Sequence, residues 1–233
     1  MFNNSTLFKI LFYTSIIFMG ILFIPSLLSK RSTRLTVRIW SQLIIFLLQR
    51  IIGVEIIFEN KFLNKNQGYL LAVNHQSIFE TIFFLKEFDK VVYIIKKELK
   101  LIPIYGWYAS RLGNIFLDRK KRISSVKTLS KEIGSLIKKG YKIIIFPEGT
   151  RQKANTIGHI KPGLYAMLKE IENSVHPVYI NSGSTWPKSG KIHKNDIMVK
   201  VLPSVKKTYE KREFLNTIRD LLIKENEKYK KLK

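Results

Sequence analysis

The stretch YLLAVNHQSIFE, residues 69–80, joins one apolar run to another through a short polar segment. Tyr69 to Val73 is typical of a buried strand, and Ile78 to Leu85 is typical of a helix. On a single ideal helix His75 and Glu80 would lie roughly 140° apart, because each residue of a helix turns by about 100°. The two side chains therefore meet only if His75 follows the strand and Glu80 lies in the first turn of the next helix.

Glu80 has two interpretations that the sequence leaves open. Ser77-Ile78-Phe79-Glu80 matches a capping box, in which the serine caps a helix and the glutamate accepts a free backbone N–H. The other interpretation is that Glu80 orients the His75 imidazole. A carboxylate has two oxygens and several lone pairs, so the two roles do not fully exclude each other.

Short runs rich in branched and aromatic residues predict further strands. These runs are Val91 to Ile95, Ile115 to Leu117, Ile143 to Phe146, Val178 to Ile180 and Ile197 to Val201. Between two of them, apolar residues from Ile123 to Ile137 repeat at helical spacing and stop before Gly140. This order predicts an α/β fold, a single domain with a central mixed, partly parallel sheet flanked by helices. Tyr209 to Lys231 predicts a charged amphipathic helix.

The stretch FPEGTR, residues 146–151, directly follows the predicted strand Ile143 to Phe146. In open α/β sheets, ligands bind at this carboxyl end of the strands. Pro147 and Gly149 suit a turn, and the Arg151 guanidinium can donate two N–H groups to one phosphate. The alternatives are structural: Glu148 pairs only with Arg151, and Gly149 only makes a turn.

A third stretch, GNIFLDR at residues 113–119, also ends a short predicted strand with polar residues. Arg119 would place a second guanidinium beside that of Arg151. The positive charge continues through residues 120–122, so a solvated basic face explains the stretch equally well.

The composition limits the possible partners. The chain has 233 residues, with 41 Lys and Arg against 17 Asp and Glu, and a formal charge of +24. One sizeable domain fits this length, and the charge favours nucleic acid, anionic lipid or an acidic protein as partner. The absence of cysteine excludes disulfides, thiolate metal sites and an acyl-cysteine intermediate.

The amino-terminal region predicts membrane association. The uncharged run from Ile10 to Ser29 would form a helix of roughly 30 Å, which is the thickness of a bilayer core. Only Lys9 precedes this run, whereas several basic residues follow it, so we expect the rest of the chain to face the cytoplasm. The following basic residues are Lys30, Arg31, Arg34 and Arg38.

A second apolar run, Ile39 to Gln49, is too short to cross a bilayer alone and is expected in the interface, beside a basic turn. Two arrangements fit: a single crossing followed by an interfacial helix, or a hairpin whose first helix enters one leaflet. Two buried helices of a soluble domain are the alternative. We accordingly divide the chain into membrane-associated helices, residues 1–54, and a catalytic domain, residues 55–233.

The stretches NHQSIFE, GNIFLDR, FPEGTR and HPVYI, in this order, closely resemble the sequence blocks of the glycerolipid acyltransferases, in particular bacterial 1-acylglycerol-3-phosphate acyltransferases. Residues 97–107 also resemble that family, and the resemblance covers roughly residues 55 to 205. The family's first block most often has an aspartate where this chain has Glu80, whose side chain is one methylene longer.

The resemblance implies an α/β acyltransferase without metal or cofactor. His75 would be the general base on a glycerol hydroxyl that attacks an acyl thioester, and Glu80 would orient its imidazole. No acyl-enzyme is required. The residues implied in binding the acceptor's phosphate are Arg119, Glu148, Gly149, Thr150, Arg151 and Lys161.

The implied donor is acyl-CoA or acyl carrier protein, and the implied acceptor is lysophosphatidic acid in an anionic membrane, here a bacterial inner membrane. The product is phosphatidic acid for phospholipid synthesis. Glycerol 3-phosphate, another lysophospholipid and a lyso-aminolipid are alternative acceptors. A membrane-anchored nucleic-acid-binding protein is the alternative of another class. It leaves NHQSIFE and FPEGTR unexplained, so nucleic acid is not an expected partner.

Overall fold

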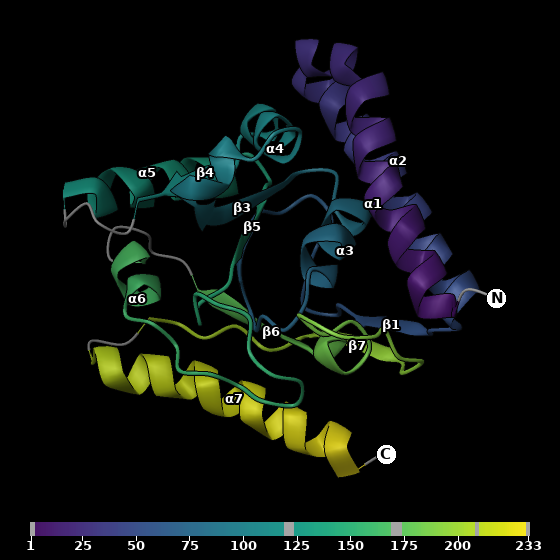
Figure 1. Ribbon diagram of the computed structural model, residues 1–233. Coiled ribbons are helices and arrows are strands. Elements are labelled where there is room, and N and C mark those ends of the chain that lie inside the picture. Colours follow the sequence, from purple (N-terminus) through teal and green to yellow (C-terminus); the bar gives the residue numbers. More distant parts are fainter. Residues whose placement is uncertain (1–2, 119–123, 169–173, 208–209, 232–233) are drawn as a thin grey trace.

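The computed structural model describes residues 3–118, 124–168, 174–207 and 210–231 (Figure 1). Its centre is a seven-stranded sheet in the order β1-β7-β6-β2-β5-β3-β4. Strands β6 and β7 are antiparallel, and every other pair of neighbours is parallel. The strands are β1 Ile56–Glu59, β2 Tyr69–Val73, β3 Val91–Lys96, β4 Ile115–Leu117, β5 Lys142–Ile145, β6 Val175–Ile180 and β7 Ile197–Val201.

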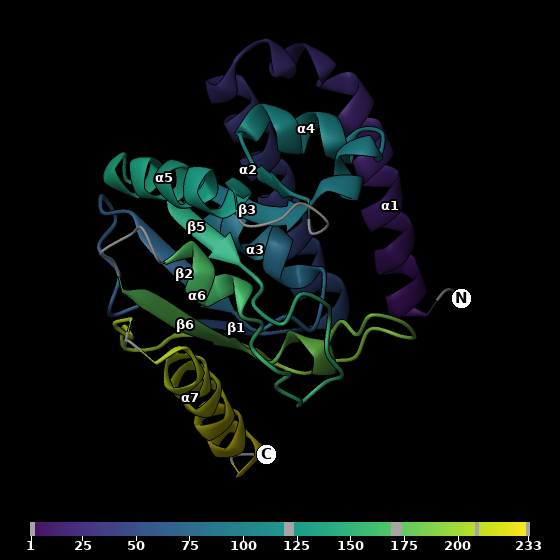
Figure 2. The same cartoon turned by 90° about the vertical axis from the view of Figure 1, so that its left-hand side faces the viewer.

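Helices cover both faces of the sheet, as Figures 1 and 2 show. Helices α1 to α4 pack on one face, and α5 to α7 pack on the other. The helices are α1 Asn4–Leu22, α2 Lys30–Leu47, α3 Phe79–Glu87, α4 Tyr105–Leu112, α5 Ser124–Lys138, α6 Gly163–Met167 and α7 Lys211–Lys231.

The central strand β2 is apolar on both faces, so helices must cover both sides of the sheet. Leu71 and Val73 contribute to the core beneath α1 to α4, whereas Leu70 and Ala72 contribute to the core beneath α5 to α7. Successive side chains of a strand point to opposite faces, so an uninterrupted apolar strand must be buried on both sides. The strand carries His75 at its carboxyl end, and this double packing fixes the position of that end.

The predicted fold class is confirmed: the protein is an α/β domain with a mixed, largely parallel sheet. The predicted strands and the helices around residues 79–87, 124–138 and 211–231 are all present. Ile123 and Tyr209, the predicted starts of two helices, lie outside the described residues. The edge strand β1 and the helix α4 were not predicted.

The amino-terminal helices form a hairpin, and they differ from the prediction in three ways. The second apolar run, which was predicted to be too short to cross a bilayer alone, belongs to a helical segment, Lys30–Ile52, that is long and apolar enough to do so. The apolar run from Ile10 to Ser29 is not one helix, because α1 ends at Leu22 and a 3₁₀ turn, Ile24–Leu28, follows. Pro25 lies in this turn, where it has no N–H to donate and restricts the residue before it. The predicted basic turn is also wrong, since those residues belong to α2. Its first turn is capped by the Ser29 hydroxyl, which accepts the Ser32 N–H at 3.1 Å.

The hairpin is both attached to the domain and largely exposed. Phe8 and Phe12 of α1 each contact Trp186 edge-on, with ring centroids 5.0 Å apart. Asn4–Leu22 and Lys30–Ile52 are long and apolar enough to cross a membrane, and only 22% and 28% of their most apolar windows are buried. Core helices of a soluble protein would be mostly buried. This exposure therefore favours association with a membrane.

Candidate active site

The two motifs NHQSIFE and FPEGTR lie side by side at the carboxyl edge of the sheet. Strands β2 and β5 are parallel neighbours, with Ala72 opposite Ile145. Asn74 and Phe146 directly follow these two strands. Segments about seventy residues apart in the chain thus end at the same place, where α/β sheets bind ligands.

His75 is held between a carboxylate and an aromatic ring. Its Nδ1 lies 3.5 Å from Glu80 Oε2, and its ring stacks on Phe146 with centroids 4.0 Å apart. Nδ1 is buried and makes no hydrogen bond to the described residues, so the Glu80 carboxylate is close to the imidazole without being bonded to it. Such bonds are often long before substrate binds. The side chain is 17% exposed, which leaves the imidazole accessible to a hydroxyl.

Glu80 lies where both of the roles that the sequence left open can be served, since it bonds the turn before α3 and faces the His75 imidazole. Its carboxylate is fully buried and accepts the backbone N–H groups of Gln76 at 3.1 Å and Ser77 at 3.0 Å. The Ser182 hydroxyl donates a third bond at 2.5 Å. The Ser77 N–H also lies 3.1 Å from Oε2, the oxygen that faces His75. Glu80 therefore closes the turn before α3 and places one carboxylate oxygen beside the imidazole.

The Ser77 hydroxyl completes the capping arrangement by accepting the Phe79 N–H at 3.1 Å. The turn before α3 is consequently bonded on both sides. A carboxylate at residue 80 is part of the local fold as well as of the site.

Glu148 is not paired with Arg151, which excludes that structural alternative. Its Oε2 accepts the backbone N–H of His75 at 2.8 Å, and its Oε1 accepts that of Gly158 at 2.7 Å. Burial raises the pKa of the Glu148 carboxyl to about 7, and the nearby Glu80 charge adds to the rise, while the two N–H donors oppose it. Glu148 thus ties the FPEGTR segment to the backbone of the histidine.

The remainder of FPEGTR forms an open loop. Gly149 has a φ of +73° and donates its N–H to the Phe146 carbonyl at 3.0 Å, so it makes the tight turn that a residue with a Cβ rarely adopts. Thr150 is exposed and Arg151 is half-buried. Within the described part of the chain, the Arg151 guanidinium makes no hydrogen bond or ion pair. It remains available to an anion.

The other two predicted phosphate-binding residues are placed differently. The Lys161 N–H donates to the Pro147 carbonyl at 2.9 Å, which brings its backbone next to FPEGTR, and its side chain is exposed. Arg119 lies outside the described residues. The preceding Asp118 forms an ion pair with Lys97 at 3.2 Å.

Several residues of the site were missed by sequence reasoning. Ser182 follows β6, which neighbours β2, so its place after the HPVYI strand was a usable signal. Gly158 donates its backbone N–H to Glu148, and Gln152 donates its backbone N–H to the His75 carbonyl, each at 2.7 Å. Backbone donors of this kind are not marked by residue type in the sequence. The Gln152 side chain also donates to the Thr150 carbonyl at 3.1 Å. Among the residues that the structure describes, no group of three or more His, Asp and Glu side chains could hold a metal ion.

Comparison with known proteins identifies the family. The family model described as Acyltransferase matches residues 55–181, which is more than half of the chain. The chain belongs to the acyltransferase family. This membership confirms the resemblance seen in the sequence blocks, and with it that the protein is an enzyme of the O-acyltransferase class.

Relatives of this acyltransferase share a common name. The 1-acyl-sn-glycerol-3-phosphate acyltransferase of Pseudomonas aeruginosa is 31% identical over 80% of this chain and 74% of its own length. The enzyme of the same name from Saccharomyces cerevisiae is 28% identical over 74% of this chain, but this covers only 59% of the yeast protein.

A solved structure supports the fold of this acyltransferase. The 1-acyl-sn-glycerophosphate (LPA) acyltransferase PlsC of Thermotoga maritima superposes with a TM-score of 0.76 and covers 97% of this chain and 96% of its own. Sequence identity is 20%, so the comparison concerns the fold alone. The agreement over nearly the whole chain includes the amino-terminal helices.

Proposed function

We propose that this acyltransferase transfers a fatty acyl group from an acyl thioester to the free hydroxyl of 1-acylglycerol 3-phosphate, which gives phosphatidic acid. One observation carries the proposal: the His75–Glu80 pair follows β2, and the loop after the neighbouring strand β5 carries Arg151, whose guanidinium has no partner among the described residues. The names of the relatives supply the acceptor.

The imidazole would act on the acceptor's hydroxyl. His75 accepts the hydroxyl proton while the oxygen bonds to the thioester carbon, the carbon–sulfur bond breaks, and the proton then passes to the leaving thiolate. Glu80 stabilises the imidazolium that forms between these steps. A positioned general base contributes about 10² to 10⁴ in rate, and positioning of the two substrates contributes further.

The phosphate would bind to the open loop of FPEGTR. Arg151 supplies the paired N–H donors, and Arg119 and Lys161 are the further cations proposed from the sequence. Gly149 and Thr150 provide a backbone turn that a phosphate can approach closely. Glu148 supports this loop by its bonds to His75 and Gly158, since a buried carboxylate would repel a phosphate at close range.

We further propose that residues 1–54 attach the protein to a bacterial inner membrane, with residues 55–233 on the cytoplasmic side. The exposed apolar residues of the hairpin and the basic residues at the start of α2 support membrane contact. Acyl-CoA or acyl carrier protein, both anionic, would arrive from the cytoplasm and meet a basic surface.

The test is product identification with purified protein in neutral detergent. The acceptors are 1-acylglycerol 3-phosphate, glycerol 3-phosphate, a lysophospholipid with a larger headgroup and 1-acylglycerol, and each is offered with acyl-CoA and with acyl carrier protein. We expect phosphatidic acid as the main product and His75→Ala to be inactive. If another acceptor is acylated faster, the proposed acceptor is wrong.

A further inference from the structure

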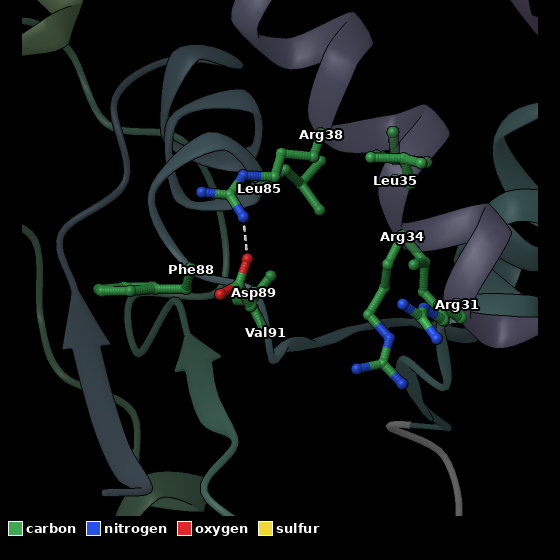
Figure 3. A pocket seen from close by; sticks show the side chains of 10 residues that line it. Arg31, Arg34, Leu35, Arg38, Leu85, Phe88, Asp89 and Val91 are labelled. Atoms are coloured by element: carbon green, nitrogen blue, oxygen red, sulfur yellow. Dashed lines mark hydrogen bonds and ion pairs between the residues drawn. The ribbon is translucent and has the colours of Figure 1, made fainter. Parts of the chain in front are cut away.

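A second region with an unusual lining lies where α2 crosses the end of α3 and the start of β3, near the amino ends of the parallel strands. A cavity of about 620 Å³ opens there (Figure 3). Three arginines of α2, Arg31, Arg34 and Arg38, line it together with the apolar side chains of Phe88 and Leu112, among others. The cavity thus combines a cationic wall with an apolar one.

This cavity is separate from the proposed active site. Val91, which lines it, pairs with Lys142 at the start of β5, and Tyr69 at the start of β2 pairs with the same residue. The cavity therefore adjoins the amino ends of these parallel strands, whereas His75 follows their carboxyl ends. The length of β2, roughly 13 Å at about 3.3 Å per residue, lies between the two levels.

The cationic wall is incompletely neutralised. Three arginines face one acid, Asp89, which leaves a lining charge of +2. Asp89 pairs with Arg38, yet the Asp89 side chain is 77% exposed, so a stronger anion can replace it. Arg38 Nε is buried and has no hydrogen-bond partner among the described residues.

Arg31 and Arg34 are also available. In Figure 3 they point from α2 to the same side of the cavity, away from the Arg38–Asp89 pair. Arg34 makes one weak bond, from Nε to the Lys30 carbonyl at 3.3 Å, and its guanidinium lies over the Tyr141 ring, 5.8 Å from the centroid, a contact that leaves its N–H groups free to donate. The described residues offer Arg31 no hydrogen bond or ion pair. Two neighbouring guanidinium groups of this kind suit a phosphate, which can accept several N–H bonds at once.

The cavity continues into the exposed apolar face of the hairpin. Leu35 lines the cavity and is 60% exposed, Ile39 is exposed one turn further along α2, and Leu28 at the hairpin turn is 83% exposed. A free phosphate would gain nothing from this apolar surface. A phospholipid carries a phosphate beside an apolar chain, and so matches both walls.

We propose that this cavity binds the headgroup of an anionic membrane phospholipid, with the phosphate on Arg31 and Arg34 and the upper acyl chain against Leu35 and the apolar wall. The lipid would hold the hairpin and the domain in one orientation on the membrane. The inference rests on the proposed membrane association of residues 1–54 and not on the proposed reaction.

The experiment compares ligands on the full-length protein in neutral detergent. Phosphatidylglycerol, phosphatidylcholine or inorganic phosphate is titrated, and binding is measured as a rise in the unfolding temperature. We expect saturable stabilisation by phosphatidylglycerol that exceeds the effect of the other two. In Arg31→Gln/Arg34→Gln the apparent affinity for phosphatidylglycerol should fall on the order of tenfold, because both cationic contacts to the lipid phosphate are lost.

The matched control is Lys224→Gln/Lys230→Gln, which removes the same charge from exposed positions of α7. This control should bind phosphatidylglycerol as the unmodified protein does. Arg31→Glu serves as a second variant, since Arg31 is exposed and its replacement leaves the packing intact. It should lose affinity even if Arg34 proves necessary for folding.

Three results would overturn the proposal. Equal stabilisation by inorganic phosphate or phosphatidylcholine would show a site that does not require an anionic lipid. Equal loss of affinity in the α7 control would show a general charge effect. If Arg31→Gln/Arg34→Gln lost acyl transfer in detergent as completely as His75→Ala, the cavity would belong to the active site; retained transfer with weakened lipid binding supports a separate site.

Discussion

The two segments that build the proposed active site are held very differently. In residues 74–80 the turn is buried, the Glu80 carboxylate accepts hydrogen bonds from three donors, and Glu148 accepts the His75 N–H. In residues 149–151 the loop is open, and the Arg151 guanidinium has no partner among the described residues. The fold thus fixes the proposed base in advance and leaves the proposed anion-binding group open to a ligand. Preorganisation of this kind avoids reorganisation during the reaction.

Glu148 connects the two segments. It belongs to FPEGTR by sequence, yet both of its oxygens accept backbone N–H groups, one of which is that of His75. A change at Glu148 should therefore affect the fixed segment, whereas a change at Arg151 should affect only the open one.

The largest loss of acyl transfer is expected from a substitution in the fixed segment, residues 74–80. His75→Ala should lower the rate of acyl transfer by at least about 10² to 10⁴, because the general base is lost. The unfolding temperature should change little, since the imidazole makes no hydrogen bond to the described residues through Nδ1. The control is His193→Ala at an exposed histidine. Transfer within a few-fold of normal in His75→Ala would remove histidine from the mechanism.

Glu80→Gln should lower both activity and stability, because the one carboxylate bonds the turn and faces His75. An amide keeps one acceptor but sets an NH₂ group against buried donors, which costs about 1 to 3 kcal/mol of unfolding free energy. The rate should fall on the order of 10² as the charge beside the imidazolium is lost. Chemical denaturation and initial rates on the same samples measure both effects. Loss of stability with full activity would leave Glu80 a helix cap only.

In the open segment, Arg151→Ala should raise the KM for 1-acylglycerol 3-phosphate by roughly tenfold to a hundredfold. A loss of this size corresponds to the binding free energy of one or two charge-assisted hydrogen bonds to the phosphate. The stability should not change, since no described residue bonds this guanidinium. Lys153→Ala, at an exposed cation two residues along the same loop, is the matched control. An acceptor KM that is unaltered by Arg151→Ala would contradict phosphate binding at this position.

The last effect concerns Glu148, which links the two segments, and it is a dependence of stability on pH. The Glu148 pKa is about 7 when folded and about 4.5 when unfolded. Between these values the folded protein holds a proton that the unfolded chain has lost, so this group makes stability fall as pH rises, by about 3 kcal/mol in total. Glu148→Gln should abolish that part of the slope. Denaturation curves from pH 4.5 to pH 8 measure it, and identical slopes in both proteins would refute the assignment.

Sequence reasoning reached the parts of the molecule that local pattern determines. The buried strands β2, β3 and β5 are runs of branched apolar residues, and both motifs follow such runs directly. Strand β1 was missed because its residues alternate between half-buried and exposed positions at the sheet edge. The start of α2 was missed because basic residues at its first turns resemble a solvated turn.

The contacts of the site were less predictable because they join distant segments. The bonds from Glu148 to His75 and Gly158, and from Ser182 to Glu80, form only when β2, β5 and β6 lie side by side. The cavity lined by the arginines of α2 likewise takes its other lining residues from α3, β3 and α4, so no single stretch of sequence predicts it.

One measurement addresses the division between the two segments most directly: the ratio of kcat/KM for 1-acylglycerol 3-phosphate to that for 1-acylglycerol, which lacks the phosphate. We expect Arg151→Ala to lower this ratio by roughly tenfold or more, while His75→Ala lowers both rates and leaves the ratio of any residual activity unchanged. If Arg151→Ala leaves this ratio unchanged, phosphate recognition lies elsewhere and the open loop is not the anion site.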